Sequence, residues 1–152
     1  NSIPFNKLHL QRLNNILKIH SKRIKWFSNL NQKKWLEIMS KCYLMLDPFP
    51  FGGCNTSLEA FSLNIPVIAL PSNNITGRFT YGFYNKMNIN NLELVIANSN
   101  TDYINKTVNL IKNKGLYYKL VKDIYINKHK LFEEIESIEE YEQIFKMLAH
   151  KI

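Results

Sequence analysis

The fold is decided by residues 46–61, which read LDPFPFGGCNTSLEAF. An apolar run over residues 43–46 leads into this stretch and stops at Asp47-Pro48. Proline has no backbone donor, and it disfavours a helical conformation in the residue before it. We therefore expect a buried strand that ends at Leu46.

The second half of the stretch predicts a glycine turn and a short helix. Gly52-Gly53 allows unusual backbone dihedrals and the close approach of a ligand. The residues expected to cap the helix are Asn55, Thr56 or Ser57. Another apolar strand, residues 66–70, follows within a few positions. Strand, turn, helix and strand make a βαβ unit, and the free N-terminus of its helix is an anion site.

The flanking segments extend this alternation. Before the stretch we expect a helix over Lys7–His20, a short strand over Arg23–Phe27 and a helix over Gln32–Lys41 capped by Asn31. After it we expect a helix over Arg78–Lys86, a short strand or turn over 92–95, a helix capped by Thr101 and ended by Gly115, and helices over Tyr117–Lys130 and Ser137–Leu148. The pattern predicts an α/β fold, a Rossmann-like parallel sheet flanked by helices, with a helical C-terminal tail.

Length and composition describe one globular domain, residues 1–152. Hydrophobic residues make up 45% of the 152 residues, which is enough for a core and excludes a disordered chain. No apolar run approaches the roughly 18 residues of a membrane span. The two cysteines, Cys42 and Cys54, lack metal-ligand spacing, so we expect reduced thiols in an intracellular, cytoplasmic protein.

The net charge of +8 is concentrated in the first third of the chain. Residues 1–47 carry nine Lys or Arg side chains against two acidic ones. Such a surface attracts anions, either a nucleotide diphosphate or nucleic acid, although on charge alone a surface of solvated lysines is the favoured explanation. The aromatic and basic pattern of an RNA-recognition motif is absent, so no nucleic-acid partner is expected. A run of glutamates, residues 133–140, is expected to be a solvated helix face rather than a metal site.

The chain opens on a predicted helix, whereas a doubly wound nucleotide domain usually opens on a strand. Its first residue is Asn1, not methionine. Either the fold is unusual or the first strand-helix-strand lies upstream, and we expect the second, a fragment of a longer protein.

Residues 23–82 resemble the C-terminal nucleotide-sugar half of GT-B glycosyltransferases. The resemblance is closest to glycosyltransferase family 41, which contains the O-linked N-acetylglucosamine transferases and their bacterial relatives. The motifs that carry it are Leu46-Asp47, Pro48-Phe49-Pro50-Phe51, Gly52-Gly53, Asn55-Thr56, Ile65-Pro66-Val67-Ile68 and Gly77-Arg78. A similar tail follows, with Leu94, Ile96, Ala97 and Tyr103 before the closing helices.

The resemblance implies a UDP-sugar site, with no cofactor and no metal. The diphosphate would lie on the Gly52-Gly53 turn and on Cys54, Asn55 and Thr56, although the family usually has His or a hydroxyl residue where Cys54 stands. Glu59 matches the carboxylate that holds the ribose hydroxyls, a role suited to a group that accepts two hydrogen bonds. A family segment that supplies basic and imidazole groups reads Gln32, Trp35 and Ile38 here, and the neighbouring Lys33 and Lys34 are candidates to substitute.

The leading hypothesis is the UDP-sugar-binding half of a glycosyltransferase that transfers a hexose or N-acetylhexosamine to a protein or glycan acceptor. It would be inverting and metal-independent if the family-41 resemblance holds. The resemblance implies that an acceptor domain and the family's catalytic lysine and histidine lie upstream, so no catalytic residue is assigned and this chain alone is expected to be inactive. The alternatives are a retaining GT-B hexosyltransferase and a non-catalytic nucleotide-binding or scaffold domain.

Overall fold

The computed structural model describes residues 11–12, 15–16, 23–132 and 135–149. The chain divides into two compact units, Asn1–Lys34 and Trp35–Ile152. Most of the helix expected over Lys7–His20 lies outside the described residues. The strand expected over Arg23–Phe27 is wrong, because residues 24–30 contain no strand. A strand is stable only when its backbone groups pair with a neighbouring strand, and the described sheet lies entirely in the second unit.

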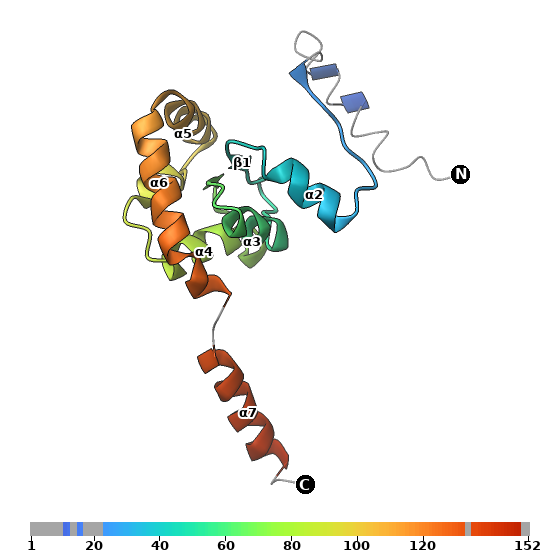
Figure 1. Cartoon of the computed structure of the whole chain (residues 1–152), viewed down its shortest axis with the longest axis vertical. Helices are drawn as coiled ribbons and strands as arrows, with labels where there is room; N and C mark the ends of the chain where they lie inside the picture. Colours follow the sequence, from blue (N-terminus) through green and yellow to red (C-terminus); the bar gives the residue numbers. More distant parts are fainter. Residues whose placement is uncertain (1–10, 13–14, 17–22, 133–134, 150–152) are drawn as a thin grey trace, which may run out of the picture. The chain divides into compact units, whose positions relative to one another are not determined.

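The elements of the chain follow one another as the apolar pattern predicts (Figure 1). The helices are α2 (Gln32–Met39), α3 (Asn55–Ser62), α4 (Phe79–Lys86), α5 (Asn100–Lys112), α6 (Lys114–Asn127) and α7 (Ile135–Ala149). The strands are β1 (Met45–Leu46) and β2 (Val67–Ile68), and the 3-10 helices are η2 (Ile75–Gly77), η3 (Leu92–Leu94) and η4 (Lys128–Leu131). The segment expected as a strand or turn at 92–95 is thus mostly a 3-10 turn.

The sheet is parallel, as expected, but small. β1 pairs with β2 in the register Met45 to Val67 and Leu46 to Ile68. A single parallel bridge, Ala69 to Ile96, adds a third segment beside β2. Both α3 and α5 contact β2. The described part of the chain is therefore α/β and rich in helix, with a much smaller sheet than a complete Rossmann-like domain would have.

A tyrosine hydroxyl completes the ladder of β2. The Tyr84 Oη accepts a hydrogen bond from the backbone N–H of Val67 at 2.8 Å and donates one to the Val67 carbonyl oxygen at 3.0 Å. Both backbone groups of Val67 point toward the side where Ala69 pairs with residues 95–97. Burial raises the pKa of Tyr84 far above its usual value, so the hydroxyl keeps its proton and both bonds. The Tyr84 hydroxyl thus satisfies the two backbone groups of Val67 that a neighbouring strand would otherwise bind.

The core lies around β2 and is made by residues from most elements of the second unit. Its fully buried members include Phe61, Val67, Ile68, Tyr84, Met87, Val95, Leu120 and Ile124. Phe61 of α3 makes an edge-to-face contact with Tyr84, with ring centroids 4.8 Å apart. These contacts fix α3 against the sheet and thereby position the turn before it.

Several helix boundaries differ from expectation by one to three residues, and α6, for example, covers Lys114–Asn127 rather than Tyr117–Lys130. Two helix caps differ as well. Ser99, not Thr101, caps α5: its Oγ accepts a hydrogen bond from the Asp102 backbone N–H at 3.1 Å. Asn113, not Gly115, separates α5 from α6 and caps the second helix through a 3.1 Å bond from the Leu116 N–H. An asparagine side chain can satisfy a helix's first N–H groups, whereas glycine only removes a side chain.

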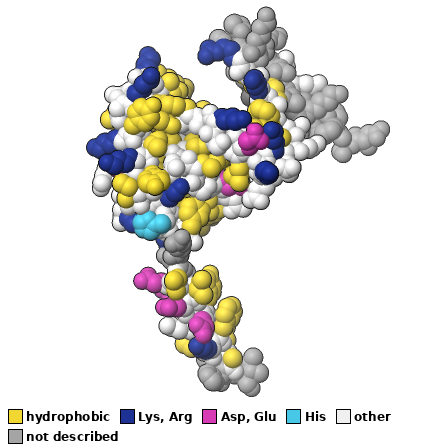
Figure 2. All heavy atoms as spheres, viewed as in Figure 1, with side chains coloured by type: hydrophobic (Ala, Val, Ile, Leu, Met, Phe, Trp, Pro, Cys, Tyr) yellow, Lys and Arg dark blue, Asp and Glu magenta, His cyan; other side chains and the backbone are white. Residues whose placement is uncertain are grey.

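The last helix, α7, presents the acidic run to solvent. Glu136, Glu139 and Glu140 are exposed, as expected, and Figure 2 shows acidic and apolar side chains along this helix. Glu133 and Glu134 lie outside the described residues. Across the described part of the chain, no helix has the length and apolar character needed to cross a membrane.

Candidate functional site

The carboxylate of Asp47, at the end of β1, organises the glycine turn. Asp47 is only 4% exposed. Its Oδ1 accepts a hydrogen bond from the Gly53 backbone N–H at 2.5 Å, and its Oδ2 accepts one from the Thr80 hydroxyl at 2.7 Å. Its own carbonyl oxygen accepts a third bond, from the Tyr103 hydroxyl at 2.9 Å. Asp47 is therefore a turn carboxylate that ties β1 to α4 and α5.

The two glycines of the turn are needed for close approach inside the protein. No glycine among the described residues has a positive φ, so the turn does not use the dihedral freedom that Gly52 and Gly53 allow. A Cβ on Gly52 would lie 2.9 Å from Asp47 Oδ2, and one on Gly53 would lie 2.9 Å from Ser57 Oγ and closer still to Thr56 Oγ1. The atoms that approach these two glycines most closely are thus side-chain atoms of the protein itself.

Both amide N–H groups of the turn are already used within the protein. Gly53 donates to Asp47, and Gly52 donates to the Thr76 carbonyl oxygen at 3.1 Å. An anion at this turn would therefore depend on the first N–H groups of α3, which have no intrahelical acceptor. Those groups belong to Asn55 and Thr56, two of the residues expected to hold a diphosphate.

A chain of hydroxyls behind the turn was not foreseen from the sequence. Thr80 Oγ1 lies 2.8 Å from Ser57 Oγ, which in turn lies 3.2 Å from the Gly53 carbonyl oxygen. A carboxylate only accepts hydrogen bonds, so the Thr80 proton points to Asp47 and Ser57 donates to Thr80. The chain fixes the N-terminal end of α3 from inside the protein.

The start of α3 differs from the expected capping pattern. Cys54 occupies the cap position and its side chain makes no capping bond. Asn55, Thr56 and Ser57 are instead the first three residues of the helix. Ser57 cannot serve as the cap because its hydroxyl is buried against Thr80.

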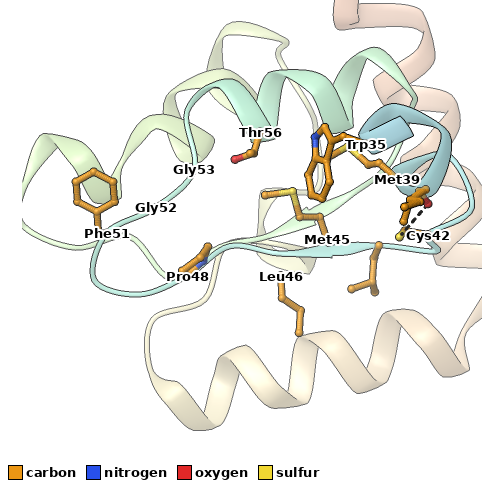
Figure 3. Close-up of a pocket in the computed structure, with 12 residues that line it drawn as sticks. Trp35, Met39, Cys42, Met45, Leu46, Pro48, Phe51, Gly52, Gly53 and Thr56 are labelled. Carbon is orange, nitrogen blue, oxygen red and sulfur yellow. Dashed lines mark hydrogen bonds between the residues drawn. The ribbon is translucent and has the colours of Figure 1, made fainter. Parts of the chain in front are cut away.

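An apolar cavity of about 400 Å³ opens beside this helix start (Figure 3). It is lined by residues of α2, β1, the turn and the start of α3, namely Trp35, Ile38, Met39, Cys42, Leu44, Met45, Leu46, Pro48, Phe51, Gly52, Gly53 and Thr56. The Thr56 hydroxyl is the one side-chain oxygen among these residues. Such a lining favours a flat or apolar group in the interior and a polar group near Thr56.

Glu59 lies one turn into α3 and has a hydrogen-bond partner, Trp35, that the sequence did not indicate. Its Oε2 accepts a hydrogen bond from the Trp35 indole Nε1–H at 2.8 Å, and the pair is partly buried. Trp35 also lines the cavity, so the carboxylate is linked to the cavity wall. The second oxygen of the carboxylate, Oε1, keeps its acceptor capacity.

The other expected site residues are distributed differently. Cys54 is half-buried and Asn55 is exposed, and neither is among the residues that line the cavity. Lys33 and Lys34 are exposed residues of α2 and belong to the first unit, and their expected role stays a prediction. Among the described residues, no group of three or more His, Cys, Asp or Glu side chains could hold a metal ion.

The electrostatics of the site keep its structural donors protonated. Burial, together with the nearby charge of Asp47, raises the pKa of Tyr103 to about 12. Its hydroxyl therefore remains a donor to the Asp47 carbonyl oxygen throughout the neutral range.

No protein-family model and no curated protein sequence matches this chain. Among solved structures, it is similar to a variant of the O-GlcNAc transferase of Thermobaculum terrenum, with a TM-score of 0.71 and 22% identity. The match covers 83% of this chain and 24% of the transferase chain, so this chain spans about a quarter of that protein. At this identity the similarity shows the fold. The chain therefore has a GT-B glycosyltransferase-like fold.

Proposed function

We propose that this chain is the UDP-sugar-binding part of a glycosyltransferase that transfers a hexose or N-acetylhexosamine to a protein or glycan acceptor. The observation that carries the proposal is the fold shared with an O-GlcNAc transferase over 83% of this chain. The carboxyl ends of parallel strands are the usual ligand site of such folds, and the turn lies at the carboxyl end of β1.

The diphosphate would bind at the start of α3. The backbone N–H groups of Asn55 and Thr56 and the Thr56 hydroxyl are the donors available there, because Gly52 and Gly53 already donate within the protein. The positive end of the helix dipole adds to the attraction. In a metal-independent, inverting reaction of the family-41 type, these donors would stabilise the negative charge that develops on the departing UDP.

Glu59 would accept a ribose hydroxyl through Oε1, while Oε2 remains bonded to Trp35. The cavity would take the flat, less polar part of the ligand against Trp35, Met39 and Pro48. This division assigns polar contacts to α3 and apolar contacts to α2 and β1. Calorimetry on the full chain tests it, with UDP, UDP-N-acetylglucosamine and GDP as ligands, and we expect weak binding with a preference for the uridine series.

The variant Glu59→Gln sharpens the test. It keeps the side-chain shape but loses the charge-assisted part of the hydrogen bonding, so UDP affinity should fall about tenfold, since such bonds contribute roughly 1.5–3 kcal/mol each. The exposed Glu93→Gln, on η3, is the matched control and should bind like wild type. The 2′,3′-dideoxy form of UDP offers no hydroxyls and should bind wild type and Glu59→Gln equally. A folded wild-type chain that binds all three nucleotides equally, or none, would overturn the proposal.

A further inference from the structure

On the premise of the nucleotide site proposed above, we infer that Trp35 is a positioning residue, which holds the Glu59 carboxylate in the orientation that receives a ribose hydroxyl. The two side chains come from different helices and lie 24 residues apart in the chain, α2 for Trp35 and α3 for Glu59. Their hydrogen bond, 2.8 Å from Nε1 to Oε2, is partly buried. Figure 3 shows the indole nitrogen of Trp35 directed toward α3.

The energetic reason is the freedom of a glutamate side chain. Glutamate has three rotatable side-chain bonds, and fixing such a side chain costs conformational entropy. Because the indole N–H already selects one orientation, a ligand that meets Glu59 does not meet this cost again. An indole is suited to the task, since it only donates and cannot compete as an acceptor.

The geometry leaves the carboxylate able to act. Trp35 contacts Oε2, and each carboxylate oxygen has two lone pairs, so Oε1 and the remaining lone pair of Oε2 can still accept from a diol. Glu59 itself does not line the cavity, whereas Trp35 and Thr56 do. The indole therefore connects the apolar wall of the cavity to the Glu59 carboxylate.

Trp35 could also contact a ligand directly, and the variant must separate the two effects. Trp35→Phe keeps an aromatic ring on the cavity wall and removes only the N–H donor and part of the ring area. If the residue acts through Glu59, the loss depends on that carboxylate and on ribose hydroxyls. If it acts by direct contact, the loss depends on neither.

The experiment is a double-mutant cycle on the full chain with Trp35→Phe, Glu59→Ala and the double variant, each assayed by calorimetry with UDP and with 2′,3′-dideoxy UDP. We expect Trp35→Phe to weaken UDP binding about fivefold to tenfold, the value of one hydrogen bond of this kind. The same substitution should change neither UDP binding in the Glu59→Ala background nor dideoxy UDP binding by wild-type Glu59. The matched control is Trp26→Phe, the chain's other tryptophan, which should bind like wild type.

A second readout needs no nucleotide. In a ¹H–¹⁵N correlation spectrum, the indole N–H signal of Trp35 should exchange slowly with solvent and should shift in Glu59→Ala, while that of Trp26 should not move. If Trp35→Phe weakens dideoxy UDP as much as UDP, or if its effect persists in Glu59→Ala, the loss comes from ring contact with the ligand and not from the orientation of Glu59, and the inference is wrong. Unchanged UDP binding by Trp35→Phe also overturns it and leaves the proposed function standing. No nucleotide binding by the folded wild type overturns both.

Discussion

The strongest structural prediction concerns Asp47, because its carboxylate joins three elements while it is almost fully buried. Asp47→Ala removes the acceptor of the Gly53 N–H and of the Thr80 hydroxyl. A hydrogen bond to a charged group contributes about 1.5–3 kcal/mol, and burial at 4% exposure leaves little room for water to replace it. We expect Asp47→Ala to lower the free energy of unfolding by about 3–5 kcal/mol, a large part of the stability of an ordinary domain.

Asp47→Asn should be much milder, because the hydroxyl chain can reverse. The amide oxygen can still accept from Gly53, and the amide N–H₂ would donate to Thr80 Oγ1. Thr80 would then donate to Ser57, and Ser57 to the Gly53 carbonyl oxygen, which lies 3.2 Å away. Every buried group keeps a partner, so the loss should be about 1 kcal/mol, the difference between charged and neutral bonds.

The assay is denaturation by urea, followed by far-ultraviolet circular dichroism, with midpoint and slope fitted for each variant. The half-buried Asp123→Ala, on α6, is the control and should change stability by less than about 0.5 kcal/mol. If Asp47→Ala stays within about 1 kcal/mol of wild type, the turn is not held by this carboxylate. If Asp47→Asn lowers the free energy of unfolding as much as Asp47→Ala does, the negative charge itself is required, and the hydroxyl chain does not reverse.

Two further predictions concern lysine side chains that donate hydrogen bonds at helix ends, Lys130 at the end of α4 and Lys106 beside Asp102 on α5. Lys130→Met should lower the free energy of unfolding by about 1 kcal/mol, because its ammonium donates to the Met87 carbonyl oxygen at the end of α4 and to Asn127 Oδ1 at 2.7 Å. The exposed Lys122→Met is its control in the same melting experiment, and an equal loss in both would contradict the assignment. The pKa of Asp102 is lowered by its hydrogen bond from Lys106 at 2.6 Å and by the Asn98 N–H. A lowered folded-state pKa adds stability above the unfolded pKa and loses it as pH falls through the folded value. The stability deficit of Asp102→Asn, measured by thermal melting, should therefore be present at neutral pH and disappear in acid; a deficit independent of pH would argue against it.

The amino-acid sequence by itself determined the order of elements in the second unit. The apolar run before Asp47, the break at Pro48 and the apolar run after Ile65 are local signals, and they predicted β1, α3 and β2 in their observed order and parallel pairing. Such a pattern depends only on how its own segment is buried, and the spacing of apolar residues in that segment indicates this directly. The local pattern was less reliable for helix ends. Ser99 caps α5 where Thr101 was expected, and Asn113 separates α5 from α6 where Gly115 was expected.

The tertiary structure alone decided which polar groups meet. Thr80 lies 33 residues from Asp47, Tyr84 lies 17 from Val67, and Trp35 lies 24 from Glu59. Nothing in the spacing of these residues marks them as partners, since each pair is brought together by packing of α2, α3 and α4 around the strands. The expected roles of Gly52 and Gly53 changed for the same reason: sequence shows that a side chain is missing, and only packing shows that the space belongs to Asp47, Thr56 and Ser57.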